Sequence, residues 1–349
     1  MLLTSLKLKN FRSYLDREFN FSHQVNLIVG PNTSGKSNIL ESVYFLSTGK
    51  SERADLEQEL INYNQEFSRV TGLVEKDGEK EKLEIILTRG MVAGSKESKK
   101  RYLINDVPKR MVDFVGKAAC VLFNPEDLEI IIDSPSIRRR YLNNCLETID
   151  SQYRRAALSY EKGLRQRNKL LQQIRDEGKS RNVLFFWDKL LIENGSLLTQ
   201  KRQEFIDFVN KEPQRFGSLT LSYQKSLISP QRLEKYCREE VAAATTLVGP
   251  HRDDFSVFFK ERNLQTYGSR GEQRTAIFSL KLGEMEYMSL KIGERPILLL
   301  DDIFSELDHD NRQKLIEVIP QQQTIMSTTD LRLIEPALRQ RMNIISLTP

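Results

Sequence analysis

The stretch GPNTSGKS, from Gly30 to Ser37, decides the fold of this 349-residue chain. It matches the pattern G-x-x-x-x-G-K-[ST], follows the apolar run QVNLIV and precedes a helical pattern that starts at Lys36. Glycines let the backbone turn so that successive N–H groups face a phosphate at the positive end of the helix. A glycine-rich turn that arises by chance would rarely stand between an apolar strand and a helical pattern. The sequence therefore predicts a phosphate-binding loop between a buried strand and a helix.

This loop predicts ATP as the ligand and Mg²⁺ as its counter-ion. The Lys36 side chain can reach the β- and γ-phosphates, and the Ser37 hydroxyl can ligate Mg²⁺. The nucleotide-binding residues that we expect are Gly30, Pro31, Asn32, Thr33, Ser34, Gly35, Lys36 and Ser37.

The acidic partner of the loop is expected in ILLLDDIFSELD, Ile297 to Asp308. A continuous apolar run suits a strand buried on both faces of a parallel sheet, and a carboxylate at its end faces the ligand crevice. Asp301 is expected to hold Mg²⁺, chiefly through water. Asp302 is expected to orient or polarise the attacking water, so that Asp302 and Lys36 are the predicted catalytic residues. The two motifs together indicate an Mg-nucleotide triphosphatase.

Composition indicates a globular protein of a reducing compartment. Charged residues make up 29% and hydrophobic residues 39%, and the net charge of +5 permits an anionic partner. The three cysteines are odd in number and far apart, which argues against a disulfide framework and a zinc site. No apolar run approaches the length of a membrane span or of a signal-peptide core. We expect a soluble, cytoplasmic protein without a membrane partner.

The pattern along the chain predicts an α/β protein with two lobes. Residues 1–134 and 275–349 alternate strands and helices, which suits a P-loop sheet with an antiparallel β portion. Residues 135–274 read as a mostly helical second lobe. Its segment from Ser136 to Arg181 has 12 Lys and Arg against 5 Asp and Glu, a local net charge of +7. That segment could contact DNA phosphates, or it could be a solvated helix face.

A second phosphate sensor is predicted at GSRGE, Gly268 to Glu272, where an amphipathic helix begins. Unpaired N–H groups, a positive dipole end and a hydroxyl together suit a γ-phosphate. Because the P-loop has its own crevice, this helix start would serve ATP held by another copy in a head-to-tail dimer. Such an arrangement is typical of ABC-type ATPases, whose signature resembles L-S-G-G-Q. Ser269, Arg270, Gly271 and Glu272 are the residues expected to act in trans.

The chain as a whole resembles the RecF family of recombination-repair proteins, relatives of the SMC and Rad50 heads. The resemblance spans nearly the whole chain and rests on LKNFRSY, FNPEDLEIIIDSPSIRRRYLN, LVGPHRDDF, GSRGEQRT, LLLDDIFSELD and STTD. It implies an ABC-ATPase head. Thr33 departs from the glycine usual in the family, and Glu52 from a common apolar residue. No glutamine loop is recognised; its equivalent would lie near Phe123 to Asp127.

The resemblance also implies roles for two further segments and for partners. Ser305 and Asp308 fall in the loop that crosses between protomers, and Thr328 and Thr329 take the switch position. A member of this family would dimerise with ATP on gapped or junction DNA, without sequence preference. It would cooperate with RecR and RecO to load the RecA recombinase. Weak, DNA-stimulated ATP hydrolysis would reset it.

Three other functions stay open. A transport ATPase would need a membrane partner, and an SMC- or Rad50-like tether would need a far longer helical arm than residues 135–274 can form. A non-hydrolysing switch that uses ATP only to join two copies differs from our interpretation in turnover alone. Residues 251–254, His-Arg-Asp-Asp, could form a polar site or a turn that supports the fold.

Overall fold

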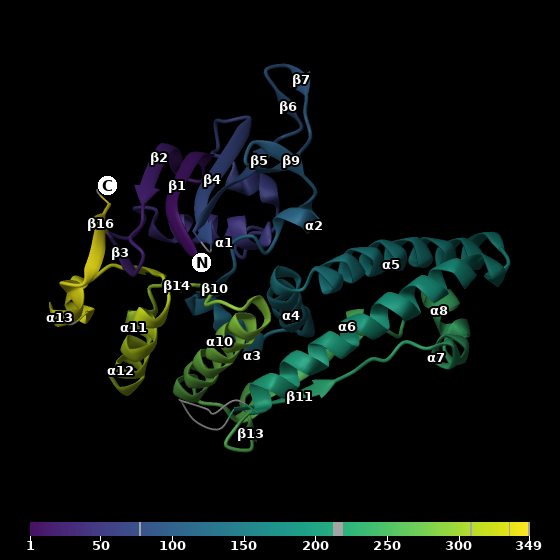
Figure 1. The fold of residues 1–349 in the computed structure, drawn as a ribbon. Helices are drawn as coiled ribbons and strands as arrows, with labels where there is room; N and C mark the ends of the chain where they lie inside the picture. Colours follow the sequence, from purple (N-terminus) through teal and green to yellow (C-terminus); the bar gives the residue numbers. More distant parts are fainter. Residues whose placement is uncertain (77, 212–218, 308, 335, 348–349) are drawn as a thin grey trace. The chain divides into compact units, whose positions relative to one another are not determined.

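The computed structural model describes residues 1–76, 78–211, 219–307, 309–334 and 336–347 (Figure 1). The chain forms two compact units. Unit 1 comprises Met1–Asp127 and Glu284–Pro349, and unit 2 comprises Leu128–Gly283. These bounds differ from the predicted lobe bounds by seven residues at the first crossing and nine at the second, both inside or beside helices. The fold is of the α/β class that the sequence predicts.

Unit 1 contains a five-stranded parallel sheet that carries the P-loop. Its strand order is β10-β14-β15-β3-β16, and every neighbouring pair is parallel. The strands are β3 (Val25–Val29), β10 (Cys120–Phe123), β14 (Ile297–Asp301), β15 (Thr324–Thr328) and β16 (Met342–Ser346). Helices α11 (Ile303–Glu306), α12 (His309–Val318) and α13 (Pro336–Arg339) belong to the same unit.

A second, antiparallel sheet completes unit 1, with the strand order β2-β1-β4-β5-β8-β9. Its strands are β1 (Leu2–Phe11), β2 (Tyr14–Asn20), β4 (Phe67–Lys76), β5 (Glu79–Thr88), β8 (Lys100–Ile104) and β9 (Val107–Lys109). The short β6 (Met91–Val92) and β7 (Ser95–Lys96) pair separately, and α2 (Met111–Phe114) follows β9.

Helix α1 (Lys36–Thr48) joins the two sheets of unit 1, because it contacts β4 and β5 of one and β10, β14 and β15 of the other. Leu6, Phe45 and Leu299, from β1, α1 and β14, are each fully buried in one apolar cluster. At about 25 cal/mol per Å² of apolar area, this burial is the main driving force for placing the helix. The P-loop is thereby fixed at the end of a helix that is buried on both sides.

Unit 2 is mostly helical. Its helices are α3 (Glu129–Ile132), α4 (Pro135–Ile149), α5 (Ser151–Glu177), α6 (Phe185–Lys211), α7 (Pro230–Lys235), α8 (Cys237–Ala243), α9 (Leu264–Tyr267) and most of α10 (Arg270–Ile292). A small sheet has the order β11 (Leu219–Gln224), β12 (Asp254–Phe259) and β13 (Arg262–Asn263). The 3₁₀ helices η3 (Arg181–Leu184) and η4 (Pro250–Arg252) precede α6 and β12.

The two longest helices, α5 and α6, pack against each other (Figure 1). Local sequence sets the ends of α5. The Asp150 carboxylate caps its start by accepting from the N–H groups of Gln152 and Tyr153, at 2.8 and 3.0 Å. Gly178, with φ of 66°, ends it in the left-handed conformation that glycine tolerates best. Each of these helices has 27 residues, about 40 Å at 1.5 Å per residue.

A buried ion pair lies at the centre of unit 2. The Arg202 guanidinium donates to Asp253 Oδ2 at 2.9 Å, and the two side chains are 3% and 0% exposed. Arg202 also donates to Tyr153 Oη and to the Pro250 carbonyl, and the hydroxyl of Tyr223 donates to Asp253. These hydrogen bonds link α5, α6, η4 and β11 to one carboxylate. Asp253 therefore supports the fold of unit 2.

The neighbours of Asp253 in the sequence have comparable structural contacts. Asp254 accepts two hydrogen bonds from Arg138 of α4, at 2.6 and 3.0 Å. His251 Nε2 lies 3.0 Å from the Thr246 carbonyl and Nδ1 lies 2.8 Å from Tyr160 Oη. Since a carbonyl can only accept, Nε2 carries the proton and Tyr160 donates to Nδ1. Residues 251–254 thus form a turn that supports the fold, the second of the two alternatives.

Replacing Asp253 with Asn should destabilise unit 2 strongly. The variant keeps the shape of the side chain but leaves the buried Arg202 cation without its counter-charge, so we expect a loss of about 3–5 kcal/mol in the free energy of unfolding. Urea denaturation followed by circular dichroism measures it. The matched control is Asp176→Asn, which breaks an exposed pair with Arg175 and should not move the midpoint. Equal midpoints for both variants would contradict the structural role.

Stability should fall on acidification because of His251. Burial lowers the pKa of this imidazole from 6.5 to about 4, with Arg252 and Arg139 adding to the shift. The unfolded chain therefore takes up a proton below pH 6.5 that the folded chain resists until about pH 4. His251 should remove about 3 kcal/mol of stability by pH 4. Thermal melts of wild type and His251→Gln between pH 7 and pH 4 test this; parallel curves would refute it.

Candidate nucleotide-binding site

The P-loop connects β3 to α1 through two glycines that no other residue could replace without strain. Gly35 has φ of 93°, and a Cβ placed on it would lie 2.6 Å from Tyr14 Oη. A Cβ on Gly30 would lie 2.6 Å from Ser34 Oγ. Thr33 has φ of 71°, a left-handed conformation that glycine adopts more readily than threonine. A β-branched residue in this conformation adds about 1–2 kcal/mol of strain.

The Lys36 ammonium lies inside the loop. It donates to the carbonyls of Gly30 and Pro31, both at 2.9 Å, and the side chain is buried. Burial lowers the pKa of Lys36, while the carboxylates of Asp302 and Asp301 act in the opposite direction. The charge is therefore held where a phosphate would sit against the backbone N–H groups.

Three oxygen-bearing side chains meet at the carboxyl ends of β14 and β15. The Asp301 Oδ1 atom accepts from Ser37 Oγ at 3.0 Å and from Ser327 Oγ at 2.7 Å. Asp301 and Ser327 are register partners in the parallel pair. Mg²⁺ in nucleotide sites takes one or two carboxylates, waters and substrate phosphates, so this donor set fits the ion. The structure brings together Ser37 and Asp301, the two residues predicted for metal binding.

Ser327 is a residue that the sequence analysis missed, although a signal was present. The run TIMST reads as a strand, and the ends of neighbouring parallel strands lie at the same edge of the sheet. Tyr14 was also missed. Its hydroxyl donates to the Ser34 carbonyl at 3.4 Å across the P-loop, and burial raises its pKa to about 12.

Asp302 lies beside this cluster in a left-handed conformation, with φ of 51°, at the start of α11. Its backbone N–H donates to Ser327 Oγ at 3.0 Å. Asp and Asn tolerate this conformation better than other residues with a Cβ. The strand end thus turns sharply at the residue predicted to act on the attacking water.

The two predicted switch residues differ in their surroundings. Thr328, the last residue of β15, is fully buried, and its hydroxyl is 3.2 Å from both the N–H and the carbonyl of Asp330. Thr329 is exposed. Thr328 is therefore positioned by its own turn, next in the chain to Ser327.

The signature segment lies in unit 2, at the start of α10. Ser269 and Glu272 form a capping box: the Ser269 N–H and Oγ donate to Glu272 Oε2 at 3.0 and 2.9 Å, and the Glu272 N–H donates to Ser269 Oγ at 3.3 Å. The N–H of Ser269 and then its hydroxyl lower the pKa of Glu272. Arg270 and Gly271 are exposed, and a Cβ on Gly271 would meet no atom within 4 Å.

The predicted dimer loop is described only in part. Ser305 belongs to helix α11, and Asp308 lies outside the described residues. The segment proposed for the glutamine loop ends at Asp127, which is buried and whose Oδ2 accepts from the Asn124 N–H at 2.8 Å.

A cavity of about 620 Å³ opens beside the start of α1. Its lining includes Asn38, which follows Ser37 directly and donates to Ser13 Oγ at 3.0 Å. Tyr63 and Leu56 also line it and are 91% and 66% exposed. The lining also includes Arg12 and Arg89, so the cavity combines polar and cationic groups with exposed apolar side chains.

Comparison with known proteins gives a consistent result. A family model described as the RecF/RecN/SMC N-terminal domain matches residues 2–346. The "DNA replication and repair protein RecF" of an Exiguobacterium species is 36% identical over 354 residues, covering 95% of this chain and 93% of that protein. The protein of the same name from Herpetosiphon aurantiacus is 36% identical over 361 residues, covering 95% and 94%.

Two solved structures are similar to this chain, one described as RecF and the other as an Smc head. A structure described as the recombination mediator protein RecF with ATP in the RecFOR pathway superposes with a TM-score of 0.87 at 32% identity. It covers 95% of this chain and 93% of that chain. An Smc head bound to the C-winged helix domain of ScpA has a TM-score of 0.52 at 18% identity, covering 99% and 93%. That second likeness is one of fold alone.

Proposed function

Because this chain belongs to the RecF proteins of the RecF/RecN/SMC N-terminal domain family, we propose that it is an ATP-dependent DNA-binding protein of recombinational repair. The observation that carries the proposal is the hydroxyl–carboxylate cluster of Ser37, Asp301 and Ser327 behind an intact P-loop. The relatives are named for DNA replication and repair, and a similar structure holds ATP. We also propose that units 1 and 2 act as lobes I and II of an ATPase head.

ATP binding uses the P-loop residues, with the Lys36 ammonium placed against the phosphates. Lys36 would exchange its two carbonyl acceptors for phosphate oxygens, which are better partners for a buried cation. Ser37 and Asp301 would hold Mg²⁺, which would neutralise charge on the phosphate oxygens while the γ-phosphoryl group is transferred to water. The nucleoside would lie in the cavity beside Asn38, with its base near Tyr63.

Hydrolysis would depend on Asp302, which we propose orients the attacking water. Its side chain is one methylene shorter than that of the glutamate usual in transport ATPases. The switch position is occupied by Thr328 and Thr329, where transport ATPases have a histidine. Both features suit slow turnover, so that hydrolysis times the release of a complex. We propose that DNA stimulates this weak activity.

The ATP site would be completed by a second copy of the chain. Ser269 and Gly271 would face the γ-phosphate held by the partner protomer, with Arg270 and Glu272 flanking them. Support comes from the helix start itself: a 23-residue helix offers N–H groups and a positive dipole end, and Gly271 leaves space for close approach. The loop from Ser305 to Asp308 would cross between the protomers.

The partners follow from the same family. We propose that the dimer holds single- and double-stranded DNA at gaps or junctions through phosphate contacts, some from the segment with a net charge of +7. A RecR-like mediator and RecO would join it to load RecA, in the cytoplasm. The related structures are described as parts of the RecFOR pathway. Among the described residues, no helix is long and apolar enough to span a bilayer.

A second candidate is a switch that binds ATP without hydrolysing it. This switch has less support than the ATPase. The left-handed turn at Asp302 brings a carboxylate, the group proposed to act on water, to the strand end beside Asp301 and Ser327. A long SMC-type tether has less support still, since the longest helices in the described ranges have 27 residues.

The substitution Asp302→Asn distinguishes the ATPase from the switch that binds ATP without hydrolysing it. Asn keeps the left-handed backbone and the shape of the side chain, so ATP affinity should change less than threefold. The rate of phosphate release should fall at least tenfold because the carboxylate is gone. Single-turnover assays with labelled ATP measure both quantities. An unchanged rate would exclude Asp302 from the chemistry, and no turnover in wild type would favour the switch.

Ser269→Arg tests the composite site. The variant should bind ATP normally but fail to dimerise, because a large cation would fill the space meant for a phosphate of the partner. Analytical ultracentrifugation with ATP and Mg²⁺, with and without gapped duplex DNA, measures the mass. Ser151→Arg, at an exposed position that starts α5, is the matched control. If the mass of the wild type is the same with and without ATP, even on DNA, the trans arrangement is refuted.

A further inference from the structure

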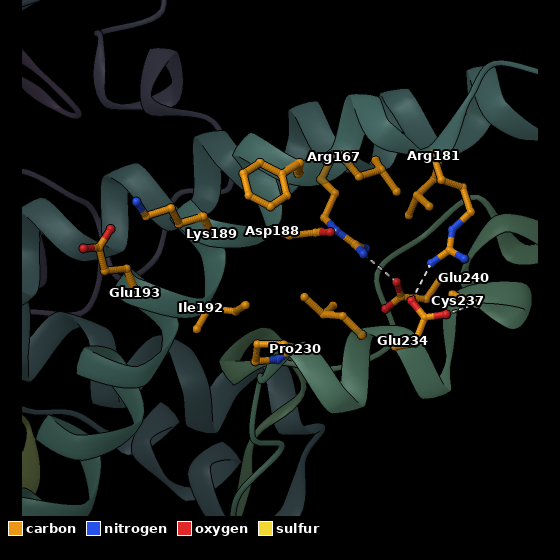
Figure 2. A pocket seen from close by; sticks show the side chains of 14 residues that line it. Arg167, Arg181, Asp188, Lys189, Ile192, Glu193, Pro230, Glu234, Cys237 and Glu240 are labelled. Atoms are coloured by element: carbon orange, nitrogen blue, oxygen red, sulfur yellow. Dashed lines mark hydrogen bonds and ion pairs between the residues drawn. The ribbon is translucent and has the colours of Figure 1, made fainter.

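A second cavity lies far along the sequence from the ATP site, within unit 2. It has a volume of about 460 Å³ and is formed by α5, η3, α6, α7 and α8 (Figure 2). Leu171, Leu184 and Leu233 line it and are 1%, 4% and 5% exposed, so its interior is apolar. Nothing in the ATPase chemistry uses this cavity.

Large aromatic side chains are exposed beside it. Phe185, which lines the cavity, is 77% exposed, and the adjacent Phe186 is 63% exposed. Contiguous exposed aromatics next to a preformed apolar cavity are typical of interaction sites, where such residues contribute most of the binding energy.

The charges of the lining are largely neutralised within the unit. Arg167, 2% exposed, pairs with Asp188 at 2.7 Å and with Glu240 at 2.8 Å; Figure 2 shows it pointing toward Glu240. Arg181 pairs with Glu234 at 3.1 Å. Together with the rim residues Lys189 and Glu193, the lining has three cations and four carboxylates. A surface with a net charge of −1 is unsuited to a nucleic acid, although the neighbouring segment is strongly basic.

Two charged residues at the rim of the cavity indicate the direction in which a partner helix would lie. Lys189 and Glu193 are exposed and one helical turn apart on α6, and within the described ranges neither has an ion pair in the structure. A partner helix lying along α6 could place an acidic residue on Lys189 and a basic residue on Glu193. The charges would then fix the direction of the partner, and the apolar cavity would supply affinity.

We propose that this cavity receives a large apolar side chain from an amphipathic helix of a mediator protein, flanked by one acidic and one basic residue. The proposal rests on the proposed function, which supplies the partner class. It places the protein partner on unit 2 at α6, away in sequence from the P-loop and from the signature segment.

Binding of purified RecR and RecO to the full chain tests the proposal. Wild type, Phe185→Glu and Leu158→Glu are titrated by isothermal calorimetry with ATP present. Leu158 is an exposed apolar residue of α5 outside the cavity lining, so it is the matched control. We expect at least tenfold weaker binding of the RecR-like mediator by Phe185→Glu and less than twofold change by Leu158→Glu. Lys189→Glu should weaken the same mediator severalfold, an effect that shrinks at high salt.

Each other outcome overturns the proposal in a distinguishable way. Equal binding by wild type and Phe185→Glu refutes the cavity but leaves the proposed partners intact. If neither mediator binds wild type, the partner assignment itself fails. ATP turnover and affinity for single-stranded DNA are measured on the same variants and should stay within twofold. A parallel loss of DNA affinity in Phe185→Glu would instead identify the aromatic surface as a base-stacking platform.

Discussion

One oxygen atom joins the parts of the ATP site. Oδ1 of Asp301 accepts hydrogen bonds from Ser37 at the start of α1 and from Ser327 at the end of β15. The contact exists only when β14 and β15 pair in parallel with the register that sets Asp301 opposite Ser327. A slip of β14 by one residue would turn Asp301 to the other face of the sheet and leave Ser327 behind. The register of the buried strands therefore determines whether the residues proposed to bind Mg²⁺ meet at all.

The two units depend on different kinds of interaction. Unit 1 is organised by apolar packing of α1 between two sheets, whereas unit 2 has a fully buried ion pair at its centre. A buried pair adds little net stability compared with apolar residues of the same shape, but breaking it is costly. It can serve specificity, because Asp253 accepts from Arg202 of α6 and from Tyr223 of β11 at the same time.

Sequence reasoning captured the parts of the site that local chemistry dictates. A P-loop requires its glycines, lysine and serine in fixed order, and a buried apolar strand ending in Asp301 is distinctive without any structure. Ser327 and Tyr14 could not be read in the same way, because their roles depend on which strand lies beside which. The cavity of unit 2 is still less visible, since its lining comes from five elements between Arg167 and Glu240. The predicted roles of Ser269 and its neighbours depend on a second copy, which a single chain does not contain.

The left-handed turn at Asp302 limits the side chains that can occupy the end of β14. Aspartate and asparagine adopt this conformation more readily than glutamate, because their short polar side chains can hydrogen-bond locally. A longer carboxylate at this position would therefore favour a different path of the chain between β14 and α11. The backbone conformation of this one residue thus restricts which carboxylate can occupy the position predicted to act on the attacking water.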